Sequence, residues 1–177
     1  MRMKTFISTV LAAITFVATL HAGEPKGLQD ARQAYKAIKN PTEADRVHYL
    51  TQLVRMREKL TRADSAAMDA IDAEIIRHPM PASTSAAQLK KALVGRWMSP
   101  RRPYFYHADG TMAANEDTRE ANVGDWAIKG NKFFENIRDD QADPGTVIYL
   151  LNETDFVHGA HAPLFYLRRG TAFPWKL

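Results

Sequence analysis

The stretch from Leu93 to Arg102, Leu-Val-Gly-Arg-Trp-Met-Ser-Pro-Arg-Arg, separates two halves of the chain that have different residue patterns. Before it, apolar residues recur at the three- and four-residue spacing of amphipathic helices. After it, short strand-like runs alternate with Gly, Pro, Asn and Asp, which is typical of strands joined by turns. Helices and strands segregated in this way predict an α+β fold.

Residues 1–22 have the parts of a secretory signal peptide. Arg2 and Lys4 precede an apolar run from Phe6 to Leu20, and Ala22 is the small residue needed for cleavage. The run of about fifteen residues is shorter than the roughly 20 needed to cross a bilayer. Because no cysteine follows, a lipid anchor is excluded. We expect an exported protein, periplasmic or secreted, with no stable membrane insertion once the leader is removed.

Composition excludes several classes of function. The 177 residues include no cysteine, which excludes disulfides, thiolate catalysis and cysteine-ligated metal centres. The net charge is +4, and it falls to +2 when the two charges of Arg2 and Lys4 are removed with the leader. Nucleic-acid binding requires a strong basic stripe, so no nucleic-acid partner is expected.

Residues 23–78 are predicted to form a hairpin of two to three amphipathic helices. Because Pro is well suited to the first helical position, Asn40-Pro41 predicts that the second helix starts at Pro41. Asp64 or Ser65 is suited to cap a third helix. Each helix has one apolar stripe, which we expect to pack within the hairpin or on the following domain. A partner-binding or membrane-surface role for the basic face of the second helix is the alternative.

Residues 79–85 are predicted to be a linker, and residues 86–177 a β-barrel domain that opens with a short helix capped by Ser85. Eight short strands joined by hairpins, with no helix between them, predict an up-and-down antiparallel barrel. Such a barrel has room for side chains or one small ligand. The tail residues Phe173 and Trp175 are expected to dock on it. The predicted strands are 96–99, 103–108, 111–116, 122–129, 132–138, 146–151, 155–159 and 164–169.

The second predicted strand is aromatic on both faces. Tyr104 and Tyr106 share one face, whereas Phe105 and His107 share the other. We therefore expect one face to look into the barrel and the other to lie under the helices.

The Gly95-x-Trp97 motif resembles the opening strand of lipocalin-like (calycin) domains. The resemblance covers about Leu93 to Arg169, and the helical region has no counterpart in it. Later motifs that are similar to the small lipocalin-like domains of bacterial exported proteins are Phe105…Asp109-Gly110-Thr111, Gly124-x-Trp126-x-Ile128 and Phe165-Tyr166-x-Arg168.

The resemblance implies a structural role for four residues. Trp97 is expected to pack at the closed end of the barrel beside Gly95, and Arg168 or Arg169 is expected to cover its ring as a cation–π contact. The chain departs from true lipocalins in its short strands and in lacking a disulfide.

The candidate ligand-binding residues are Arg101, Arg102, Tyr104 and Tyr106, together with Trp126. Arginine forks and aromatic faces recognise carboxylates, phosphates and sugars. The alternative is that this loop only packs against the helices.

Two histidines, His158 and His161, are the only close pair in the sequence. With a carboxylate they could form a zinc site, but Gly159 and Pro163 place them in a turn, so ordinary loop histidines are expected. No serine lies in a nucleophile elbow. We therefore expect no metal, no cofactor and no catalytic residue.

The expected function is that of an exported, non-enzymatic binding protein whose lipocalin-like barrel takes a small apolar ligand or a protein partner. One alternative is an inhibitor or interaction module that acts on an exported or host enzyme. Another is an enzyme or metal-binding protein that uses His158 and His161. An internal cavity on the order of several hundred Å³ favours ligand binding, whereas a filled barrel with an exposed apolar patch favours the interaction module.

Overall fold

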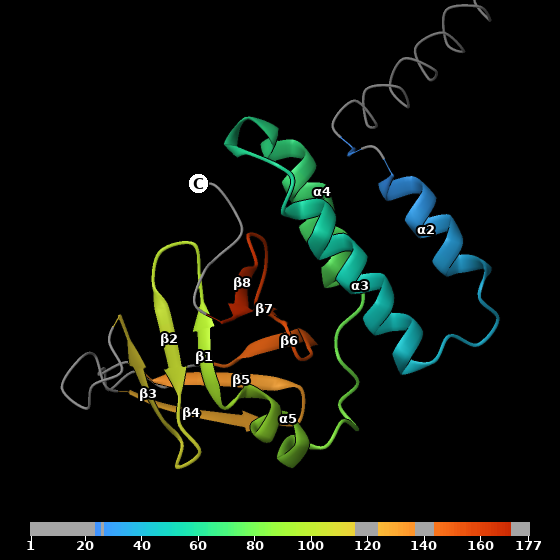
Figure 1. Ribbon diagram of the computed structural model, residues 1–177. Coiled ribbons are helices and arrows are strands. Elements are labelled where there is room, and N and C mark those ends of the chain that lie inside the picture. The colour runs from blue at the N-terminus through green and yellow to red at the C-terminus, as the bar shows by residue number, and fades with distance from the viewer. Residues whose placement is uncertain (1–23, 26, 116–123, 137–143, 171–177) are drawn as a thin grey trace, which may run out of the picture.

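The computed structural model describes residues 24–25, 27–115, 124–136 and 144–170 (Figure 1). Helices precede a closed antiparallel barrel of eight strands, which confirms the predicted α+β fold. The helices are α2 (Leu28–Ala37), α3 (Glu43–Arg57), the 3-10 turn η1 (Arg62–Asp64), α4 (Ser65–Ile76) and α5 (Ala86–Leu93). The strands are β1 (Gly95–Met98), β2 (Pro103–Tyr106), β3 (Thr111–Ala114), β4 (Gly124–Lys129), β5 (Lys132–Asn136), β6 (Thr146–Leu151), β7 (Asp155–Gly159) and β8 (Phe165–Arg169).

The strand bounds lie within two residues of those predicted, and several predicted strand ends lie outside the described residues. The leader and the tail residues Phe173 and Trp175 also lie outside them. Across the described ranges, the structure contains no helix with both the length and the apolar character needed to cross a membrane.

The second helix starts later than predicted, because Thr42 rather than Asn40 is its N-cap. The Thr42 hydroxyl accepts a hydrogen bond from the Asp45 amide at 3.2 Å, and the Asp45 carboxylate accepts one from the Thr42 amide at 2.9 Å. This capping box satisfies two backbone N–H groups at the start of the helix that have no carbonyl partner within it, so α3 begins at Glu43.

The three helices α2, α3 and α4 lie on one side of the barrel, with α3 and α4 next to β6, β7 and β8 and with α2 packed on α3 (Figure 1). Their apolar stripes and the outer faces of these strands form one hydrophobic core. A bulge in β6 turns both Tyr149 and Leu150 toward the helices. The residues of this core include Leu50, Leu53, Ile71, Ile75, Tyr149, Leu150, Val157, Leu164 and Tyr166.

A second core fills the barrel on the side of α5. In β4, burial alternates along the strand, so that Trp126 and Ile128 both point inward. The predicted linker contributes as well, since Met80 is buried and its backbone amide donates to the Ile148 carbonyl at 3.0 Å. The residues of this core include Met80, Leu89, Leu93, Trp97, Met112, Trp126, Ile128, Phe133, Ile148 and Phe156.

A buried ion-pair cluster fixes α3 to the barrel. Arg55 donates to both carboxylate oxygens of Asp155, at 3.0 and 2.8 Å, and Arg168 Nη2 lies 2.9 Å from Asp155 Oδ1. Glu58 accepts hydrogen bonds from both arginines. Asp155 is only 1% exposed, and a buried carboxylate is tolerated in a protein interior when it is paired. The cluster therefore holds α3 against β7 and β8.

We expect Asp155→Ala to lower the free energy of unfolding by about 3–5 kcal/mol, because it breaks a buried ion pair and leaves the partly buried Arg55 and Arg168 to share the single carboxylate of Glu58. Chemical denaturation followed by circular dichroism measures this change. Glu153→Ala removes an exposed acid from the same turn and serves as the control, with an expected change below about 0.5 kcal/mol. Equal effects of the two substitutions would contradict the role assigned to Asp155.

Candidate functional site

One end of the barrel is closed by α5 and Trp97. The Trp97 ring is fully buried, and its Nε1 donates to the Leu93 carbonyl at 2.7 Å. The Arg169 guanidinium lies over this ring, 4.4 Å from its centroid. It also donates to the carbonyls of Val94, at 3.0 Å, and of Ala92. These carbonyls lie at the C-terminal end of α5, where the helix dipole favours a positive charge. Side chains of the second core therefore fill this end of the barrel.

Gly95 makes the close approach of Arg169 possible. Its backbone has a φ of +126°, and a Cβ added there would lie 2.7 Å from Arg169 Nη1. Arg168, the other candidate for covering Trp97, instead pairs with Glu58 and Asp155. Of the two arginines, it is therefore Arg169 that lies at the closed end.

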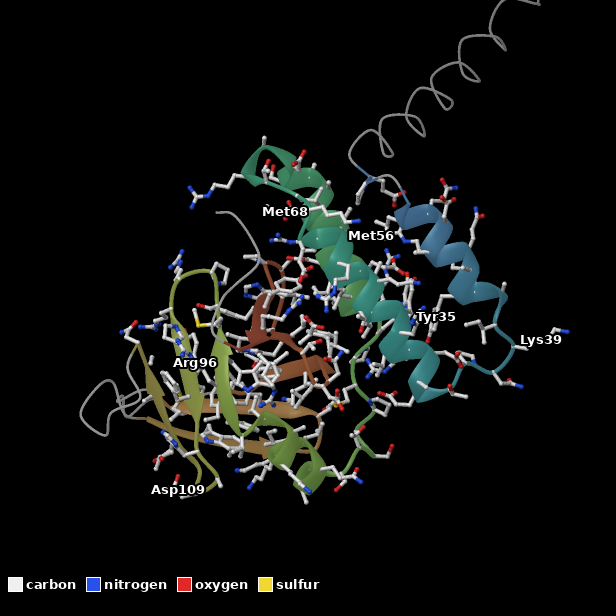
Figure 2. All side chains as sticks on the ribbon, in the orientation of Figure 1. Tyr35, Lys39, Met56, Met68, Arg96 and Asp109 are labelled. Atoms are coloured by element: carbon white, nitrogen blue, oxygen red, sulfur yellow. The ribbon has the colours of Figure 1, made fainter. Side chains whose placement is uncertain are left out.

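The other end of the barrel opens into a pocket of about 1180 Å³, which we call the open-end pocket. Figure 2 shows Met68 of α4, one of the residues that line this pocket, and Asp109 of the β2–β3 hairpin at opposite ends of the molecule. The strands supply Tyr104, Tyr106, Phe133, Glu135, Thr146, His158, Phe165 and Leu167 to its lining. The helical region and the loops supply Arg57, Leu60, Thr61, Arg62, Met68, Ser99, Arg101, Arg102, Pro163 and Leu164.

Four of the five predicted ligand-binding residues line this pocket: Arg101, Arg102, Tyr104 and Tyr106. Their loop is ordered by Ser99, whose Oγ accepts from the amides of Arg101 and Arg102 at 3.1 and 3.0 Å. Arg102 Nε donates to Tyr104 Oη at 3.2 Å, which orients the guanidinium over the Tyr104 ring.

The structure does not bring Trp126 to the open-end pocket. Its Nε1 donates to the carbonyls of His107 and Thr111, at 3.1 and 2.9 Å, beneath the β2–β3 hairpin. Its ring belongs to the filled core of the barrel.

The two faces of β2 differ from the expectation in one respect. Tyr104 and Tyr106 look inward, and their rings are parallel with centroids 6.3 Å apart. Phe105 looks outward, but it does not lie under the helices, which cover β6, β7 and β8 instead. The Arg96 guanidinium lies over its ring at 5.5 Å. The expectation for this outer face was therefore wrong, because the helices pack on the other side of the barrel.

His158 is not the loop histidine that was expected. It lies on β7, only 6% exposed, and its ring stacks on Phe156 and Phe165 with centroids 4.6 and 5.3 Å away. Its Nδ1 is 2.9 Å from Thr146 Oγ1. His161 is exposed in the following loop and does not line the pocket. In the described part of the chain, no three side chains of His, Asp or Glu converge as a metal site requires.

Phe165 is a pocket residue that sequence reasoning missed. It faces inward beside His158 on the neighbouring strand, yet it is 63% exposed because it lies at the mouth of the pocket. Period-two alternation in β8 could have identified its face. The contributions of Leu60, Arg62 and Met68 have no comparable sequence signal, because they depend on how the helices pack.

A buried aspartate fixes the loop that forms one wall of the pocket. Asp72 on α4 accepts hydrogen bonds from the Leu164 amide, at 3.1 Å, and from the Tyr166 hydroxyl. Arg57 Nε lies 3.5 Å from the Asp72 carboxylate. Burial raises the pKa of Asp72, although these hydrogen bonds and the charge of Arg57 act in the opposite direction. The β7–β8 loop is thereby anchored to the helices.

Charge is distributed unevenly through the open-end pocket. Four arginines line it at the loops and helices, whereas Glu135 is the only acid among its described lining residues. Glu135 lies on β5 near Tyr106; burial raises the pKa of the Tyr106 hydroxyl, and the charge of Glu135 raises it further. The pocket thus has aromatic walls, a positive mouth and a negative group in its interior.

We expect Trp97→Ala to destabilise the fold by about 3–5 kcal/mol, as is usual for a buried aromatic residue. Urea denaturation followed by circular dichroism measures the change. Phe165→Ala removes an exposed aromatic side chain from the same barrel and should change stability by less than about 0.5 kcal/mol. A loss below about 1 kcal/mol for Trp97→Ala would show that the closed end does not depend on this ring.

No family model, curated protein or solved structure matches this chain. Its function is therefore inferred from the residues of the open-end pocket.

Proposed function

We propose that the protein is a non-enzymatic, exported binding protein that holds one small and largely apolar molecule in the open-end pocket. The proposal agrees with what the lipocalin-like resemblance implies. It places the ligand among Tyr104, Tyr106, Phe133 and Phe165, at the end of the barrel opposite to α5.

The observation that carries this proposal is the size and position of the pocket. Its volume of about 1180 Å³ is at least as large as the roughly 300–1,000 Å³ typical of small-molecule sites. The other half of the barrel is filled by side chains around Trp97 and Phe156. A ligand would therefore rest above Tyr106 and Phe133 rather than pass through the barrel.

The two alternative functions have less support in the described residues. Among the described residues, the large hydrophobic side chains that are exposed are Ile38, at the C-terminal end of α2, and Phe165, on β8. Because they lie on different parts of the molecule, they do not form one apolar docking patch. The pair of histidines also does not form a site, because His158 lines the pocket and His161 does not. Ligand binding is accordingly favoured over an inhibitor module or an enzyme.

Binding of N-phenyl-1-naphthylamine, a neutral aromatic probe whose fluorescence rises in apolar surroundings, tests the proposal. We expect the protein to bind the probe, and Phe165→Ala to weaken binding about two- to tenfold, because one aromatic contact contributes about 0.5–1.5 kcal/mol. Ile38→Ala, the other exposed large hydrophobic residue, is the matched control and should leave the affinity unchanged.

Two results would count against the proposal. One is the absence of any probe binding by the folded protein. The other is equal affinity of the Phe165→Ala and Ile38→Ala variants, which would place the bound probe outside the open-end pocket.

A further inference from the structure

We infer that the natural ligand is an amphipathic anion that binds with its oxyanion at the mouth of the open-end pocket and its apolar body inside. The groups that select it are Arg62, Arg101 and Arg102, which we call the arginine rim. This inference rests on the proposed function, to which it adds the charge and the orientation of the ligand.

The arginine rim converges on the pocket from two separate elements. Arg101 and Arg102 lie on the β1–β2 loop, and Arg62 lies on η1 between α3 and α4. Within the described ranges, none of the three forms an ion pair with a carboxylate, whereas Arg55 and Arg168 in the adjoining cluster both pair with acids. Three like charges at one mouth repel one another, and an anionic group bound among them relieves that repulsion.

Arg102 is held ready for such a group. Its Nε donates to the Tyr104 hydroxyl at 3.2 Å, and its guanidinium lies 5.3 Å from the centre of the Tyr104 ring. The same loop is fixed by the hydrogen bonds from its two arginine amides to Ser99. A guanidinium that is already oriented loses less side-chain entropy when it forms paired hydrogen bonds to an oxyanion.

The interior of the pocket determines which end of the ligand enters first. Glu135 lies there near Tyr106 and would repel a second negative group. Tyr104, Phe133 and Phe165 provide ring surfaces for an apolar body. The positive charges of the described lining thus lie at the mouth and its one acid lies farther in, which favours an amphipathic anion with its charged end outward.

A matched pair of probes separates charge from shape. The compound 8-anilinonaphthalene-1-sulfonate has the same ring body as N-phenyl-1-naphthylamine and differs from it by one sulfonate group. We expect the protein to bind the sulfonate more tightly than the neutral probe at low ionic strength, and this preference to shrink as salt screens the partly exposed charges.

Substitution of the rim should remove the preference without removing the pocket. We expect Arg101→Gln combined with Arg102→Gln to weaken binding of the sulfonate about three- to tenfold, the range for partly exposed ion pairs, and to weaken binding of the neutral probe by a smaller factor, so that the ratio of the two affinities falls. Arg62→Gln, on a different element, should weaken sulfonate binding in the same direction.

The control is Arg96→Gln combined with Lys129→Gln. This variant removes the same number of charges from the outer face of the barrel, where the two side chains lie over Phe105 and Phe134. It should retain the full preference for the sulfonate. Circular dichroism confirms that each variant is folded before it is compared.

The outcomes distinguish this inference from the proposed function. Equal binding of both probes, or a rim variant that keeps the preference, would overturn the anionic ligand while leaving an apolar binding site in place. Failure to bind either probe would overturn both proposals. If the rim variant and its control lose the same amount of affinity for the sulfonate probe, then net charge, and not the arginine rim, attracts the sulfonate.

Discussion

The contact between Arg169 and Trp97 is the interaction on which the rest of the barrel depends. It lies where the first and last strands meet, since Trp97 pairs with Arg169 and Met98 with Arg168 in the closing register. The guanidinium covers the indole ring and donates to carbonyls at the end of α5. One side chain therefore joins the closing seam, the first strand and the helix that covers this end. Because side chains fill the end of the barrel at Trp97, the open-end pocket lies at the opposite end.

The helical region contributes to the pocket as well as to stability. It is held to the barrel by two buried carboxylates, Asp155 with Arg55 and Arg168, and Asp72 with Tyr166. Both lie close to the strands and the loop that form the pocket. With the helices fixed in this way, Leu60, Arg62 and Met68 complete a wall that the short strands alone would not provide. The short strands make the barrel shallow, and the helices extend the pocket outward.

Local sequence patterns predicted much of this structure. The turn residues located the strands to within two residues, because turns depend on backbone conformation within a few residues. The expectation that Trp97 packs at the closed end came instead from the resemblance of Gly95-x-Trp97 to the opening of lipocalin-like domains. The start of α3 was missed because Thr42 and Asp45 compete with Asn40 and Pro41 as capping residues, and the reciprocal pair of hydrogen bonds wins.

The pocket was less predictable because its residues come from distant parts of the chain. Arg101, Arg102, Tyr104 and Tyr106 were found together because they are neighbours in sequence. His158 was predicted to lie in a turn because Gly159 was given more weight than the alternation of inward and outward side chains along the strand. The residues from α3 to α4 could not have been found, since their position depends on an ion pair and a hydrogen bond that each join groups more than 90 residues apart in sequence.

The most direct test of the open-end pocket is an NMR titration of the full chain with N-phenyl-1-naphthylamine, followed through the backbone amides. We expect the largest shift changes in the β1–β2 loop, at Tyr104, Thr146 and His158, and at Phe165, with little change in α5 or at Gly95 and Trp97. Changes centred on α5 and Trp97, or spread over the outer faces of the helices, would contradict a ligand site at the open end of the barrel.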